Sequence, residues 1–463
     1  MRKSIFLFLI FILTPLICSG CVSYLNSGAF ISHPNLYGLG DSYGPSNDPE
    51  VNRLLKRLND CEKSDEVSEK YACVSLLYGT NRVAGTPFYG NAPQPQEKGT
   101  KLGEVVVSIP NNHQIGKDIR GASGPVGNKA TRIREQEYAL WDEDNAILEL
   151  EEDLFKKYAR FQLEQSNRRS SFVFIHGFNV PFQNAAYNAA QLKTDLKFEG
   201  PVFFYSWPSN GNKTQYLSDQ QDADVSAEHL AEFLKIVKDA VGTDTEIHII
   251  AHSMGNRVLG QALSTLRKDL KFQKPLFKTG VFASADLDEN LFRSWIVGPQ
   301  NSKPLFESSL IYVTDDDRAL QVSKKILALR CDDGDRKYRV GLVTKRNTCK
   351  SNRRRYSIFG SNFSTIDLSD EPGEKIFKIF GKNHNKYTKS PKIICHLNRI
   401  FDGGPAILEG SPDFLFKVIT LEGEVLKPKA GALTNKRDNC FHTKTETEFY
   451  SNFVTGAGAN SSR

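Results

Sequence analysis

The sequence has little cysteine and only one long apolar run, and these two scarcities exclude several classes of protein. Eight cysteines in 463 residues are too few for a scaffold held together mainly by disulfides. After residue 17, no apolar run is long enough to cross a membrane, which excludes a polytopic membrane protein. No CxxC pair or cysteine/histidine cluster has the spacing of a zinc site, so we expect no metal.

The net charge is also small for a chain of this length. The 60 lysines and arginines exceed the 54 acidic residues by only six, which is no argument for a nucleic-acid partner. Hydrophobic residues make up 39% of the chain and charged residues 25%, enough apolar material for a packed core. We therefore expect a folded globular protein that does not bind nucleic acid.

The first 20 residues have the form of a bacterial export signal. Cationic residues precede an apolar run at 4–17, and small residues then lead to Cys21. This order resembles a lipobox with Cys21 as the acylated residue, although Cys18 stands where that motif usually has leucine or valine. An ordinary cut after Gly20 and an uncleaved anchor are the alternatives. We expect an exported protein of the cell envelope, lipid-anchored to a bacterial membrane and facing the periplasm.

An exported chain can form disulfides, and six cysteines follow Cys21. The near neighbours Cys61 with Cys73 and Cys331 with Cys349 are the natural pairs. Six cysteines allow 15 connectivities, so the sequence leaves the pairing open.

The composition divides the chain into segments. We expect a signal peptide at 1–20 and a polar tether or surface segment at 21–65. One α/β domain at 66–402 carries a basic insert at about 331–356. A C-terminal extension with a disordered tail follows at 403–463. The insert holds six cationic residues and no acid between 345 and 355. It is either a solvated loop or a contact for anionic lipid headgroups.

Short apolar runs alternate with helical patterns from residue 171 onward. The runs lie at 171–175, 201–205, 246–250, 279–283 and 310–313. This alternation predicts an α/β fold, a mainly parallel twisted sheet with helices on both faces. Ser218 and Gln221 have capping-box spacing, which predicts that a helix starts there and buries Val225 with the other apolar residues of one face.

The segment Ala251-His252-Ser253-Met254-Gly255 joins a strand pattern to a helix pattern. It matches the nucleophile elbow G-x-S-x-G with alanine at the first glycine. Small residues are needed at 251 and 255 because backbones pass close to the serine. The turn would expose Ser253 at a helix N-terminus, where the amide of Met254 points at a developing oxyanion.

A second loop, His176-Gly177-Phe178-Asn179, directly follows the strand predicted at 171–175. Such a loop supplies the other oxyanion donor in this kind of site, and we assign it to the amide of Phe178. His176 is expected to pack and hydrogen-bond, since it precedes the serine and shapes the hole.

A serine hydroxyl needs a base, and the base needs an orienting acid. Both follow the serine along the chain, in the order acid then histidine. Asp317, a few residues beyond the strand at 310–313, is our first choice of acid, and Asp286 is the alternative. His384, in a polar loop, is our choice of base, while His396 lies within a helix pattern and His442 in the tail.

These motifs together resemble a known family. The strings HGFN, YSWPS, AHSMG, ADLD and DRAL, followed by a loop histidine, look like a bacterial α/β-hydrolase family of esterase/lipase-like proteins whose substrates are mostly unassigned. The resemblance covers about 71–402. An early strand ends here in Gly-Thr-Asn-Arg, where that family commonly has Ala-Thr-Asp-Arg.

The resemblance implies the α/β-hydrolase fold and a Ser–His–Asp hydrolase without a cofactor. It supports Ser253, Asp317 and His384 as the triad, acting on a small-molecule or lipid ester. A non-catalytic binding or interaction lipoprotein of the same fold is the alternative, because the fold alone does not guarantee chemistry.

Overall fold

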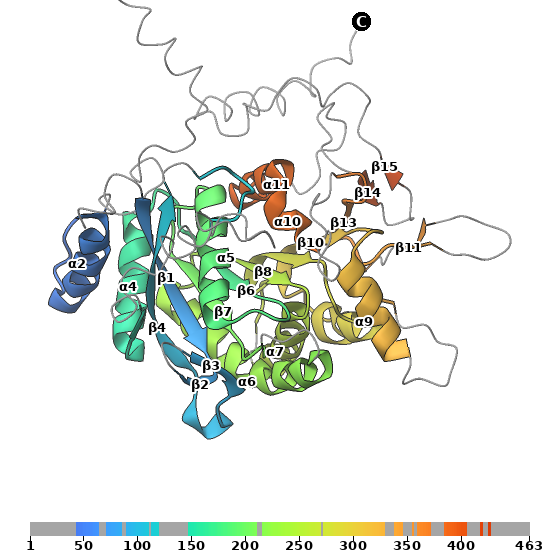
Figure 1. Ribbon diagram of the computed structural model, residues 1–463, viewed down its shortest axis with the longest axis horizontal. Helices are drawn as coiled ribbons and strands as arrows, with labels where there is room; N and C mark the ends of the chain where they lie inside the picture. The colour runs from blue at the N-terminus through green and yellow to red at the C-terminus, as the bar shows by residue number, and fades with distance from the viewer. Residues whose placement is uncertain are drawn as a thin grey trace, which may run out of the picture.

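A computed structural model describes most of the chain after residue 42 (Figure 1). The described residues are 43–63, 71–85, 89–110, 113–119, 147–210, 215–269, 272–328, 338–345, 354–355, 359–371, 384–404, 417–419 and 425–426. The expected signal peptide and Cys21, most of the basic insert, and His442 lie outside these residues. None of the described helices is both long and apolar enough to cross a membrane.

One sheet of eleven strands forms the centre of the molecule, in the order β15-β14-β13-β10-β9-β8-β6-β7-β1-β4-β5. The run from β13 to β1 is parallel throughout, and antiparallel strands extend both edges. The expected mainly parallel sheet is therefore confirmed. The strands are β1 (Tyr71–Thr80), β4 (Lys101–Pro110), β5 (Ile147–Glu149), β6 (Ser170–Ile175), β7 (Val202–Ser206), β8 (Glu246–His252), β9 (Phe277–Ala283), β10 (Phe306–Val313), β13 (Phe363–Asp367), β14 (Lys417–Ile419) and β15 (Val425–Leu426).

Helices cover both faces of this sheet (Figure 1). One face carries α2 (Pro49–Lys63), α4 (Glu152–Gln165), α6 (Tyr216–Val241) and α7 (Gly255–Asp269). The other carries α5 (Phe182–Asp195) and α11 (Pro391–Phe401). Smaller elements are α8 (Glu289–Phe292), a π-helical turn (Arg293–Val297), α9 (Arg318–Ala328), α10 (Lys386–Lys389), a 3₁₀ turn (Gln96–Lys98) and the two-stranded pairs β2 (Arg82–Ala84) with β3 (Tyr89–Pro93) and β11 (Thr344–Lys345) with β12 (Arg354–Arg355).

Strand β6 shows why its sequence is a continuous apolar run. Phe172 and Phe174 join the core beneath α5, while Val173 and Ile175 join the core beneath α4 and α6. All four side chains are fully buried. A central parallel strand is covered on both faces, so it does not alternate between apolar and polar residues. The same burial fixes the end of β6 beside the neighbouring β8.

Two segments behave differently from the sequence-based expectation. Residues 49–63, predicted as part of a tether, form α2, whose apolar side joins the core. Residues 338–343 of the predicted insert are buried or half-buried against the segment that follows β9. Val51, Leu54, Leu55 and Leu58 have the spacing of one helix face, so the sequence carried a signal for α2 that the tether interpretation passed over. In the C-terminal extension, the apolar residues of 414–426 predict a hairpin around Glu422-Gly423, and β14 and β15 pair antiparallel there at the sheet edge.

The start of α6 also differs. This helix begins at Tyr216 with Gln215 before it, and no side chain caps its N-terminus, so the capping box at Ser218 is not formed. Val225, expected on the buried face, is 49% exposed. Residues on more than one side of this helix are buried, so the spacing of its apolar residues does not identify a single buried face.

A disulfide joins Cys61 at the end of α2 to Cys73 in β1, the pairing that the close spacing favoured. Both residues are fully buried. Cys395 of α11 is also disulfide-bonded. The Cys61–Cys73 bond holds α2 against β1.

We expect the variant Cys61→Ser/Cys73→Ser to lose about 2–3 kcal/mol of unfolding free energy, because the crosslink restricts a short loop in the unfolded chain. Denaturant unfolding of the oxidised wild type and the double variant measures the difference. Equal midpoints at equal slope would show that α2 needs no crosslink.

Candidate active site

Ser253 stands at a sharp turn between β8 and α7. Its backbone is left-handed, with φ at 53°. Residues other than glycine adopt this region at a cost, and such strain is kept where the surroundings enforce it. The Ser253 amide donates to the Ala283 carbonyl at 3.0 Å, and the Ser253 carbonyl accepts from the amide of Asp286 at 3.2 Å. The elbow is therefore fixed by the end of the neighbouring strand β9.

Two glycines allow the backbones around Ser253 to approach. A Cβ on Gly177 would lie 2.8 Å from Ser253 Cβ, and one on Gly255 would lie 2.4 Å from the His176 carbonyl oxygen. Any side chain at either position would push the loop after β6 away from the elbow. The expectation of a small residue at 255 thus has a definite cause, the close passage of the β6 end.

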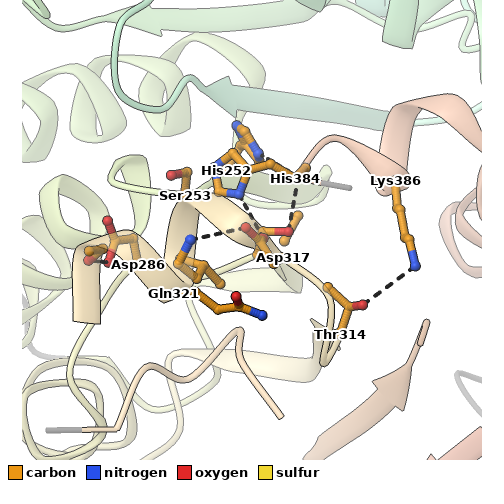
Figure 2. A network of polar contacts seen from close by, with 12 residues as sticks. His252, Ser253, Asp286, Thr314, Asp317, Gln321, His384 and Lys386 are labelled. Atoms are coloured by element: carbon orange, nitrogen blue, oxygen red, sulfur yellow. Dashed lines mark hydrogen bonds and ion pairs between the residues drawn. The ribbon is translucent and has the colours of Figure 1, made fainter. Parts of the chain in front are cut away.

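The loop histidine lies against the predicted acid. His384 Nδ1 donates to Asp317 Oδ2 at 2.7 Å (Figure 2). Asp317 Oδ1 accepts from the amide of Leu320 at 3.0 Å, so Asp317 also caps the N-terminus of α9. Each carboxylate oxygen of Asp317 has its own partner, which fixes the orientation of the carboxylate. Because Nδ1 of His384 is bound to Asp317, Nε2 is the ring nitrogen that remains for another contact.

The backbone of His384 is held by two neighbours of the serine. Its carbonyl accepts from His252 Nε2 at 3.2 Å and from Ser284 Oγ at 3.1 Å. The rings of His252 and His384 have centroids 4.7 Å apart, and His252 stacks on Tyr387 at 4.8 Å. Burial lowers the pKa of His252 well below its ordinary value, and the adjacent His384 lowers it further, so its ring is neutral.

Ser253 and His384 lie in one cluster, but no hydrogen bond joins them among the described residues (Figure 2). Catalytic hydrogen bonds are often long before substrate binds. Burial tends to lower the pKa of His384, but the charge and hydrogen bond of Asp317, with the more distant charge of Asp286, raise it above its ordinary value. The imidazole is thus a stronger base than a free one.

Asp286, the alternative acid, has other partners. Its carboxylate accepts from Tyr216 Oη at 2.7 Å and from Ser323 Oγ at 2.6 Å, and Arg339 Nε lies 3.1 Å away. Of the two candidate acids, the structure brings Asp317 and not Asp286 into contact with His384.

The amides of Met254 and Phe178 flank the elbow, one at the start of α7 and one in the loop after β6. In the described part of the chain neither amide has a hydrogen-bond acceptor. Both are therefore available to an external oxygen near Ser253.

Buried polar side chains fix the loop that carries Phe178. Ser209 Oγ accepts from the amides of Asn179 at 2.6 Å and Val180 at 3.3 Å, and donates to Asp219. Arg82 Nη2 donates to the Val180 carbonyl at 2.8 Å. Burial lowers the pKa of Arg82 to about 9 against the opposing charge of Asp219, which leaves the guanidinium charged at neutral pH.

His176 and His396, two histidines near the site motifs, have structural partners. His176 stacks on Trp207 with ring centroids 5.2 Å apart, and burial, with the charge of Arg82, lowers its pKa to about 3. His396 in α11 bonds Tyr312 through Nδ1 at 2.7 Å. No group of three or more metal-binding side chains occurs within the described ranges.

Sequence reasoning missed the residues that support the site. Arg82 and Ser209 belong to the strings Gly-Thr-Asn-Arg and YSWPS, which were noticed without a role. His252 was read only as the variable position of the elbow, and Arg339 only as part of a basic insert. The first two could have been found, because both strings recur with the other motifs of the resemblance.

The fold and the serine elbow define an α/β-hydrolase-type protein. A family model described as an alpha/beta hydrolase of unknown function (DUF900) matches residues 151–400, more than half of the chain. The chain belongs to this family, and the expected α/β-hydrolase resemblance is to that extent confirmed.

One curated relative is an uncharacterized protein, alr1448, from Nostoc sp. (strain PCC 7120 / SAG 25.82 / UTEX 2576). It is 28% identical over 145 residues, which cover 26% of this chain and 36% of the relative. The match thus spans about a third of that protein. No solved structure matches the chain.

We expect an NMR titration to place the pKa of the His384 imidazole above 6.5, and the Asp317→Asn variant to lower it, because the variant removes the charge that favours imidazolium. Asp316→Asn is the matched control, since that neighbouring carboxylate bonds Thr314 and Lys386 instead. The same pKa in both variants would contradict the assigned pairing.

Proposed function

We propose that the protein is a serine hydrolase that cleaves an ester or related acyl bond through Ser253, His384 and Asp317. The observation that carries the proposal is the His384–Asp317 hydrogen bond beside a left-handed serine at the strand–helix elbow. The membership in an α/β-hydrolase family supports it.

The mechanism follows from the roles of these groups. His384 Nε2 takes the proton of Ser253 as its oxygen attacks the acyl carbon, and the amides of Met254 and Phe178 hold the oxyanion. The imidazolium, stabilised by Asp317, gives the proton to the leaving alcohol, and an acyl-serine remains. Water then attacks with His384 as base, releases the acid, and returns the proton to Ser253.

We also propose that the protein acts in the bacterial cell envelope, with Cys21 lipid-anchored. The support is the export pattern of residues 1–21 and the buried disulfide Cys61–Cys73, since such bonds persist in oxidising compartments. The substrate would be a small-molecule or lipid ester that reaches this compartment.

We expect a fluorophosphonate probe to label Ser253, and Ser253→Ala to lose both labelling and at least about 10⁴ of the ester kcat, because the nucleophile is absent. Peptide mass spectrometry locates the label. Ser171→Ala is the matched control, because that buried serine lies at the opposite end of β6 from the loop carrying Phe178. A label on another residue, or full biological complementation by Ser253→Ala, would favour the non-catalytic binding alternative.

We expect Ser209→Ala to lower kcat by about 10–100-fold with little change in KM, because the loop that carries the Phe178 amide loses its anchor to Asp219. Ser75→Ala is the control. Its buried hydroxyl also donates to a carboxylate, Glu104 at 2.8 Å, but it lies in β1 away from the elbow. An equal loss of kcat in both variants would show a general effect of destabilisation.

A further inference from the structure

Ser284 is a second strained serine, and it lies after the strand next to that of the nucleophile. It directly follows β9, as Ser253 directly follows β8, and its φ of 46° is also left-handed. Its amide donates to the Tyr312 carbonyl at 3.3 Å, and a Cβ on Gly341 would lie 2.5 Å from its carbonyl carbon. Strain of this kind persists where the surroundings enforce it, and it is concentrated at functional sites. The proposed triad gives Ser284 no part, so its strained backbone calls for another reason.

The hydroxyl of Ser284 is directed at the loop that carries the base. Ser284 Oγ donates to the His384 carbonyl at 3.1 Å, and His252 Nε2 donates to the same oxygen at 3.2 Å. The two donors lie side by side, because His252 in β8 pairs with Ala283 in β9. Both are at most 8% exposed. One donor would satisfy this carbonyl, so two side chains on one oxygen exceed that requirement and restrict its position from two directions.

Both donors belong to the segments that form the nucleophile elbow. His252 directly precedes Ser253 (Figure 2). Ser284 follows Ala283, whose carbonyl accepts from the Ser253 amide at 3.0 Å. Two residues further on, the amide of Asp286 donates to the Ser253 carbonyl at 3.2 Å. The two donors therefore connect the backbone of the base directly to the turn that carries the nucleophile.

We propose that Ser284 and His252 are positioning residues that hold the His384 carbonyl and thereby set the distance between the imidazole and the serine nucleophile. The proposal rests on the proposed hydrolase function. Asp317 binds Nδ1 of the His384 ring, so a fixed backbone carbonyl determines the direction in which Nε2 points. Proton transfer depends steeply on this geometry, and a displacement of about 1 Å can cost roughly 10²-fold in rate.

Two substitutions at Ser284 separate the hydroxyl from the backbone strain. Ser284→Ala and Ser284→Gly both lack the donor, but only glycine adopts a left-handed φ without cost, so Ser284→Gly should unfold at the higher temperature. We expect both variants to lower kcat for 4-nitrophenyl acetate by about 10–100-fold, with little change in KM. Lys197→Gly is the matched control, and its kcat should not change. It relieves a left-handed φ of 51° near Gly200, which lies against the start of β6 rather than its end.

The two Ser284 variants give opposite results under the two explanations. An equal loss of kcat in both, despite different melting temperatures, supports a role of the hydroxyl in positioning. A loss of kcat in Ser284→Ala with wild-type kcat in Ser284→Gly would show that activity follows stability, and it would overturn the proposal. Wild-type kcat in both variants would overturn it as well.

His252 is tested through the donor that it carries. We expect His252→Leu to lower kcat by about 10–100-fold, whereas His252→Gln, whose amide nitrogen takes the place of Nε2, should restore most of the activity. His248→Leu is the matched control. His248 is a buried histidine of the same strand and stacks on Phe401 as His252 stacks on Tyr387, but neither of its ring nitrogens has a partner in the described part of the chain. Equal losses in the two leucine variants, or no recovery with glutamine, would contradict the role of His252.

An NMR titration separates this proposal from the hydrolase function, because it needs no turnover. Burial lowers the pKa of His384 and the contact with Asp317 raises it. In Ser284→Gly the imidazole should lose part of that contact, so we expect its pKa to fall. A lowered pKa in a protein without ester turnover would reject the hydrolase and retain the positioning role. Ester turnover that neither Ser284 variant changes, with an unchanged pKa, would reject the positioning role and retain the hydrolase.

Discussion

The close approach of the β6 end to the serine elbow is the constraint on which the site depends. Gly177 and Gly255 have no Cβ, so the backbone after β6 and the backbone of the serine elbow can approach to distances that any other residue at these positions would prevent. This contact holds the loop that carries Phe178 against the turn at which Ser253 is left-handed. The energy that maintains this strained turn comes from the buried sheet, since the cores on both faces hold β6 and β8 in place.

Much of the fold and the triad candidates could be predicted from sequence, because each depends on local order. Buried parallel strands appear as continuous apolar runs, and an elbow must have small residues around its serine. The choice between Asp317 and Asp286 could not be settled in this way. Both residues follow strands of one sheet, and only the folded chain shows that Asp317 bonds His384 whereas Asp286 bonds Tyr216 and Ser323.

The features that sequence reasoning missed depend on contacts between distant segments. Arg339 lies in a stretch rich in basic residues, and nothing in its neighbours distinguishes a buried guanidinium from a solvated one. His252 occupies the variable position of the elbow, and its role appears only once His384 lies next to it. The helix α2 is different, because Val51, Leu54, Leu55 and Leu58 already mark a helix face in the sequence; the disulfide partner in β1 appears only in the folded chain.

The polar cluster beside Ser253 explains why Asp286 is not the partner of the loop histidine. Tyr216 and Ser323 donate to its two oxygens, and Arg339 Nε lies 3.1 Å away. A buried carboxylate is costly unless it is paired and hydrogen-bonded, and these three groups meet that requirement without His384. The imidazole of His384 is therefore left to Asp317, and Asp286 acts on it only as a more distant charge that raises its pKa.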